Sequence, residues 1–136
     1  MINGRGYPDT INTNPIYNAM ADNTSQKISS LIKATSGQKI LLRISDSSIS
    51  DFHSLTVMGI PMLVIGKDAR LLRSTSGVNL YYQTTSIKTG GGETYDVILD
   101  TTGVAPGTYF MYDARLNHLS NDTEDYGGMM TEIVIE

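Results

Sequence analysis

Short β-prone segments separated by turn residues follow one another along most of this 136-residue chain. Gly, Pro, Asn and Asp recur between the segments, and the run Gly90-Gly91-Gly92 separates two of them. These turn residues divide the chain into short segments that suit strands, and no segment makes a convincing helix. The pattern predicts an all-β protein, a Greek-key β-sandwich or barrel of about seven to nine strands.

The spacing of hydrophobic residues makes the prediction more specific for two of these segments. The stretch Lys39–Ser45 is densely apolar, which predicts a strand buried on both faces or nearly so. The stretch Phe52–Met58 alternates, with His53, Leu55 and Val57 on one face. Gly, Ile and Pro at positions 59–61 should end that strand before a second one begins at residue 62. Residues 28–34 fit either a strand or a single helical turn.

Composition and charge exclude several classes of function. The length suits one domain, so residues 1–136 are expected to form a single unit, and we suspect that it is a piece of a longer chain. The net charge is only −4 and the chain has no basic stripe, which argues against nucleic-acid binding. No apolar run approaches the ~20 residues needed to span a bilayer, and the first residues do not form a signal peptide. The chain has no cysteine, which excludes disulfides and every thiolate-based metal site.

Four blocks of residues, in order along nearly the whole chain, resemble a cupredoxin domain of a multicopper oxidase. The resemblance is greatest to the copper-free middle domain of a three-domain enzyme, and it implies the cupredoxin-like fold. The blocks are Ile-Asn-Gly-Arg-Gly-Tyr-Pro at 2–8, Leu-Arg-Ile-Ser at 42–45, His-Ser-Leu-Thr-Val-Met-Gly-Ile at 53–60 with its sequel to 68, and Gly-Gly-Glu-Thr-Tyr-Asp-Val at 91–97 with Gly-Thr-Tyr at 107–109.

The resemblance also assigns candidate metal positions. His53 falls on a type 1 copper histidine, and His118 matches the last histidine of the family's C-terminal motif. Asp113 then stands where the family has the copper cysteine, and Met129 stands near the axial methionine. Other ligand positions of the family hold side chains that are not imidazoles: Thr56, Met58, Ile60, Tyr112 and Ala114. Because blue copper depends on a thiolate, we expect none in this chain.

Two interpretations of these residues stay open. His53, Asp113 and His118 could form a mononuclear site for Cu(II), Zn(II) or non-haem iron, since two imidazoles and a carboxylate suit each of these ions. Alternatively, they are vestigial positions at one end of the sandwich, where the imidazoles are hydrogen-bonded or solvated and Met129 is a core residue. We favour the second, because two histidines without their usual companions rarely make a tight site.

The resemblance implies a role for the chain. The parent would be an oxidoreductase that uses dioxygen as acceptor, periplasmic or otherwise exported, with its copper held outside this chain. The chain would carry no cofactor and would space and orient the neighbouring cupredoxin domains, so in isolation it would be inactive. The alternative is a stand-alone β-sandwich that serves as a binding or interaction module without a redox role.

Overall fold

The computed structural model describes residues 1–18, 23–25, 28–121 and 126–136, and the counts below refer to these residues. Seven strands have five or more residues: β4 (Lys39–Ser45), β5 (Phe52–Val57), β6 (Met62–Lys67), β9 (Ser86–Gly90), β10 (Thr94–Asp100), β11 (Gly107–Asp113) and β12 (Met130–Ile135). Five are shorter: β1 (Ile16–Asn18), β2 (Asn23–Ser25), β3 (Ile32–Ala34), β7 (Arg70–Leu71) and β8 (Tyr82–Thr84). The predicted all-β class is confirmed, and the strands beyond the predicted number have only two or three residues.

Helical structure in these residues is limited to two 3₁₀ turns, η1 (Asp9–Ile11) and η2 (Leu116–His118). Neither comes near the length and apolar character of a membrane-spanning helix. Of the open segment 28–34, only residues 32–34 form a strand, because Ile32–Ala34 pairs in parallel with the last strand, β12.

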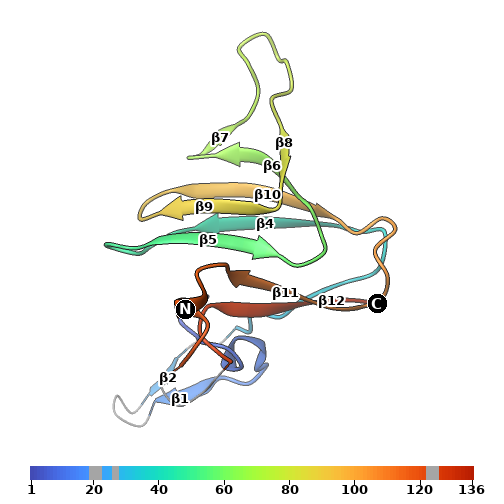
Figure 1. Ribbon diagram of the computed structural model, residues 1–136. Coiled ribbons are helices and arrows are strands. Elements are labelled where there is room, and N and C mark those ends of the chain that lie inside the picture. The colour runs from blue at the N-terminus through green and yellow to red at the C-terminus, as the bar shows by residue number, and fades with distance from the viewer. Residues whose placement is uncertain (19–22, 26–27, 122–125) are drawn as a thin grey trace.

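Two five-stranded sheets pack face to face (Figure 1). One has the order β4-β10-β6-β7, with β8 also paired to β6, and the other has the order β3-β12-β11-β5-β9. The corner at residues 59–61 takes the chain from β5 in one sheet to β6 in the other, and Gly59 turns it with a φ of 74°. This residue can adopt the left-handed conformation at little cost because it has no Cβ. Alternate residues of both sheets therefore face a shared interior.

The core lies between the sheets and is aliphatic. Val64 on β6 and Val97 and Leu99 on β10 are fully buried, and Val57 of β5 belongs to the same cluster from the second sheet. Each such side chain contributes roughly 1.5–3 kcal/mol by leaving water. The predicted alternation of Phe52–Met58 is confirmed. The expectation that Lys39–Ser45 is buried on both faces was wrong: β4 is an edge strand that buries only Leu42 fully.

A hairpin arm extends from the first sheet. We define the arm as residues 70–82, which comprise β7, the connection after it and the first residue of β8. Figure 1 shows it projecting beyond the sandwich at the end where β6 lies, opposite the β1–β2 hairpin. Leu72 anchors its base, because this side chain packs against the hydrophobic core.

Candidate functional site

Strand pairing brings His53 and Asp113 together. β11 runs antiparallel to β5, and its last residue, Asp113, lies opposite Leu55. Paired residues in adjacent strands project from the same face, and so do residues two apart in one strand. The side chains of Asp113, Leu55 and His53 therefore lie on one face of the sheet, at the end of the sandwich where β11 stops.

Asp113 is the centre of a hydrogen-bonded cluster. Its Oδ2 atom lies 2.7 Å from Nδ1 of His53 and 2.6 Å from Nδ1 of His118. The carboxylate is fully buried, while the two imidazoles retain about 15–18% of their side-chain exposure. The rings lie 5.1 Å apart and are tilted by 56°. We call these three residues the Asp113 cluster.

Main-chain amides hold the other carboxylate oxygen. Oδ1 of Asp113 accepts hydrogen bonds from the amides of Ser54 and Arg115, each at 3.0 Å. The bond to residue 115 closes an Asx turn, in which an aspartate caps the backbone two residues further on. This turn leads directly into η2, which returns His118 to the carboxylate. The carboxylate thus receives four hydrogen bonds from three separate parts of the chain.

These contacts determine the charge of the cluster. Burial alone would raise the pKa of Asp113, but the hydrogen bonds from His118, His53 and the two amides act in the opposite sense and prevail. The pKa of Asp113 is lowered to about 2, so the group is ionised at neutral pH. An ionised carboxylate only accepts hydrogen bonds, so both imidazoles must carry a proton on Nδ1 and donate it.

The depressed pKa predicts a specific loss of stability in acid. With a folded value of about 2 against an ordinary 3.8, ionised Asp113 adds roughly 2 kcal/mol of stability. That contribution is complete above about pH 4 and disappears as the pH falls through about 2. Urea unfolding of the wild type and Asp113→Asn should therefore show a free-energy difference that shrinks between pH 4 and pH 2. A difference that stays constant over this range would contradict the assignment.

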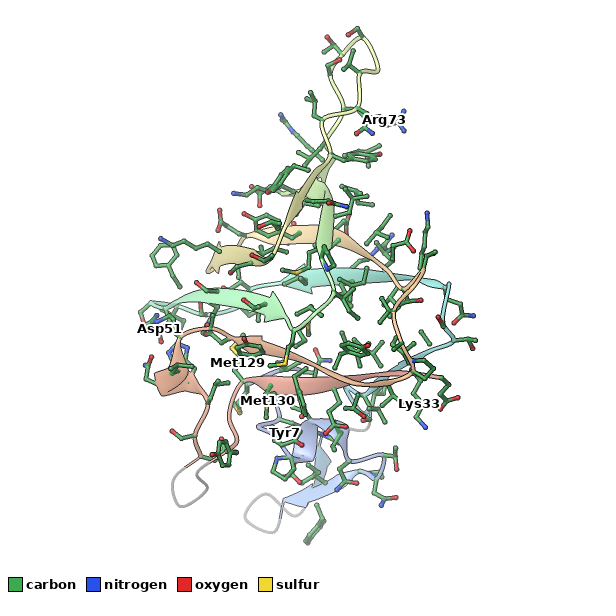
Figure 2. The ribbon with its side chains drawn as sticks, turned by 45° about the vertical axis from the view of Figure 1, so that its right-hand side comes forward. Tyr7, Lys33, Asp51, Arg73, Met129 and Met130 are labelled. Atoms are coloured by element: carbon green, nitrogen blue, oxygen red, sulfur yellow. The ribbon has the colours of Figure 1, made fainter. Side chains whose placement is uncertain are left out.

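Met129 takes part in the site through its backbone. Its amide donates to the carbonyl of His118 at 2.9 Å, and its carbonyl accepts from the amide of Asp113 at 3.0 Å. Figure 2 shows it beside Met130, where β12 begins. Its side chain lines a pocket of about 440 Å³ together with His53 and Leu55. Met129 therefore lies next to the Asp113 cluster and connects two of its members.

The structure thus gathers the residues that the sequence singled out. Potential ligand atoms of His53, Asp113 and His118 all lie within 4.8 Å of one another. The sequence interpretation missed the amides of Ser54 and Arg115. An aspartate at the end of a strand, where the chain turns, was the available signal for the second of these.

The spacing within the cluster is that of charge-assisted hydrogen bonds. Two ligand atoms that each lie ~2.0–2.2 Å from one tetrahedral ion are separated by roughly 3.3 Å. The Nδ1 to Oδ2 distances of 2.6 and 2.7 Å are shorter, so these atoms would have to separate to admit an ion between them. The donor set also lacks the thiolate of a blue copper site, because the chain has no cysteine. The residues present do not fit a type 1 copper.

A two-sheet sandwich with paired histidines at one end defines a class of protein, the cupredoxin-like domains, and comparison with known proteins supports it. A family model described as multicopper oxidase matches residues 1–132. The chain therefore belongs to the multicopper oxidase family.

Solved structures agree with this assignment. The multicopper oxidase mgLAC is 25% identical over 77% of this chain and 30% of its own, with a TM-score of 0.65. A blue copper oxidase from Nitrosomonas europaea is 27% identical over 76% of this chain and 30% of its own, with a TM-score of 0.59. A laccase from Botrytis aclada, at 19% identity and a TM-score of 0.61, shares the fold. The chain spans less than a third of the length of these proteins. No curated protein sequence matches it.

Proposed function

We propose that this chain is a cupredoxin domain without blue copper that spaces and orients the copper-bearing domains of a multicopper oxidase. The parent would be an oxidoreductase that passes electrons to dioxygen through copper held elsewhere. The chain itself would perform no redox step. In a three-domain parent it would take the middle place.

The observation that carries this proposal is the Asp113 cluster. The sequence resemblance assigns Asp113 to the position of the family's copper cysteine, and in the structure its carboxylate is hydrogen-bonded to both histidines. A buried carboxylate with two charge-assisted hydrogen bonds supplies the cross-link between strand and turn that a bound metal would otherwise supply. His53, Asp113, His118 and Met129 are then vestigial type 1 positions with a structural role.

The partners and location of the chain follow from the same proposal. Related solved structures are more than three times as long as their matched part, which supports neighbouring cupredoxin domains in the same parent. An exported location, in the periplasm or outside the cell, is our expectation for such a parent and rests on the family alone.

Metal titration of the isolated chain tests the central claim. Cu(II) and Zn(II) are each added to the protein while imidazole NMR signals and calorimetric heat are followed. We expect no binding with a dissociation constant below about 1 mM, because a metal between the imidazoles and Oδ2 would have to displace both imidazole hydrogen bonds to Asp113. We also expect no oxidase activity from the copper-treated chain.

Two results would contradict the proposal. Micromolar binding that His118→Ala abolishes would establish a mononuclear site instead. Full sequencing of the parent gene is the second test, since His-x-His and His-Cys-His motifs should be encoded outside this chain. A gene without them would remove the role of spacing copper domains while leaving the metal result intact.

A further inference from the structure

A pocket of about 440 Å³ lies beside the Asp113 cluster, at the end of the sandwich where β4 stops. Its volume is within the range of small-molecule sites in proteins. Ser45 and Ser47 in its wall are exposed, so solvent reaches it. The wall combines polar and apolar side chains, among them Ile44, Asp46, His53, Leu55, Thr89 and Met129.

Two polar atoms of this wall are buried and have no hydrogen-bond partner in the described part of the chain. One is Oγ1 of Thr89, a residue that is only 1% exposed. The other is Oδ2 of Asp46, whose second carboxylate oxygen, Oδ1, accepts from the amide of Ser48 at 2.8 Å. A buried polar atom that forms no hydrogen bond costs free energy, and a charged group costs more. A molecule that bonds to these two atoms would therefore bind with a gain.

The backbone places the two residues close together. The amide of Asp46 donates to the carbonyl of Glu93 at 3.0 Å, and its carbonyl accepts from the amide of Gly92 at 2.9 Å. Gly92 and Glu93 belong to the turn that follows β9, the strand that holds Thr89. Thr89 also lies opposite His53 in the ladder of β9 with β5, so these two side chains share a face of the sheet. Asp46, Thr89 and His53 therefore meet at the same end of the pocket.

This end of the pocket is built to accept hydrogen bonds. The carboxylate of Asp46 can only accept, and the hydroxyl of Thr89 can accept as well as donate. His53 uses Nδ1 for its bond to Asp113, which leaves Nε2 of the neutral ring as an acceptor. None of the described residues that line the pocket is a lysine or an arginine. A cation with several N–H groups fits this set, and an anion does not.

The rest of the pocket is apolar. Ile44, Leu55 and Met129 also line an adjoining pocket of about 340 Å³, which extends between β4 and the second sheet. Arg43 lies at that second pocket too, but its guanidinium is engaged by Asp96, with Nε 3.8 Å from Oδ1. An apolar chain can therefore continue from the acceptor end along the aliphatic side chains, where it leaves water.

We propose that this pocket binds a primary ammonium ion carried on a short apolar chain. A primary ammonium has three N–H donors and a positive charge, which suit the carboxylate of Asp46, the hydroxyl of Thr89 and Nε2 of His53. The chain of the ligand then lies against Ile44 and Leu55. The site does not depend on the role of the domain between copper-bearing neighbours, so either conclusion can fail without the other.

Three probes of equal chain length test the charge that the pocket selects. Hexylammonium, hexanol and hexanoate are titrated separately into the intact chain at pH 7 while backbone amide NMR signals are followed. We expect hexylammonium to bind with a dissociation constant of about 1 mM or tighter and to shift the amides of residues 46 and 89. Hexanol should bind at least tenfold more weakly, and hexanoate should not bind.

Matched variants test the two buried atoms. Asp46→Asn should weaken hexylammonium binding at least tenfold. Thr89→Val should weaken it at least threefold without lowering the stability of the protein, because the hydroxyl that it removes has no partner in the described structure. Asp100→Asn makes the same charge change as Asp46→Asn at the other end of β4, where Asp100 pairs with Lys39, and should stay within twofold of wild type.

Three results would overturn the inference. A chain that binds no hexylammonium at about 10 mM has a pocket that holds water only. Equal binding of hexanol and hexylammonium would mean that the apolar wall binds the chain and that the acceptors select no cation. Equal weakening by Asp46→Asn and Asp100→Asn would indicate attraction to the net charge of the protein rather than a site. Circular dichroism and thermal midpoints establish that each variant is folded.

Discussion

Replacing Asp113 by alanine is expected to destabilise the protein by about 3–5 kcal/mol, the range for removing one member of a buried polar pair. The substitution leaves four hydrogen-bond donors without an acceptor: two imidazole Nδ1 atoms and the amides of Ser54 and Arg115. Each buried donor without a partner costs about 1–3 kcal/mol. Urea unfolding at pH 7 measures the loss directly.

Asp113→Asn is the matched comparison, and it should cost only about 1–2 kcal/mol. The amide oxygen can still accept from Ser54 and Arg115. Its NH₂ group has two donors, which can bond to both imidazoles if each ring moves its proton from Nδ1 to Nε2. If the asparagine and alanine variants lost equal stability, the cluster would depend on the negative charge rather than on its hydrogen bonds. If neither variant lost stability, the structural role of Asp113 would be wrong.

Gly128→Ala is the second substitution with a large expected effect, at least about 3 kcal/mol. Gly128 has a φ of 72°, in the left-handed region that costs a residue with a Cβ about 1–2 kcal/mol. A methyl group there would also overlap the carbonyl oxygen of His118, which belongs to the backbone and cannot turn aside. The substitution should therefore separate Met129 from His118 and open the Asp113 cluster.

Gly103→Ala separates the two causes. Gly103 has a φ of 77°, but a Cβ at this position would have no other atom within 4 Å. This variant should lose only the conformational cost, about 1–2 kcal/mol. Chemical denaturation of both variants gives the comparison, and equal losses would mean that the overlap with His118 is relieved by a small backbone shift.

Local sequence pattern predicts much of this fold because it reflects local physics. The alternation around Leu55 and Val57 and the glycine corner at position 59 follow from strand geometry and from backbone freedom. The degree of burial of a strand is different, since it depends on neighbours that are distant in sequence. The segment that contains Leu42 is apolar enough for a central strand, yet among the described residues it pairs only with β10 and lies at the edge of its sheet.

The candidate site was likewise predictable in part from the sequence, while the rest depends on residues that are distant in sequence. The resemblance to copper-binding domains selected His53, Asp113 and His118, and the structure brings them together. It did not indicate that the imidazoles donate to Asp113 at hydrogen-bond distances. That arrangement depends on the register of β5 with β11, which is a tertiary feature, and on the local Asx turn from Asp113 to Arg115.

The hydrogen bond between His53 and Asp113 joins residues 60 positions apart, and that between Ser54 and Asp113 joins residues 59 apart. The cluster also contains His118, which follows β11 by a short turn, so one carboxylate joins the start of β5, the end of β11 and η2. None of these three segments can move away from the others without breaking a hydrogen bond to a buried charged group. The Asp113 cluster therefore acts as a three-way clamp on this end of the sandwich.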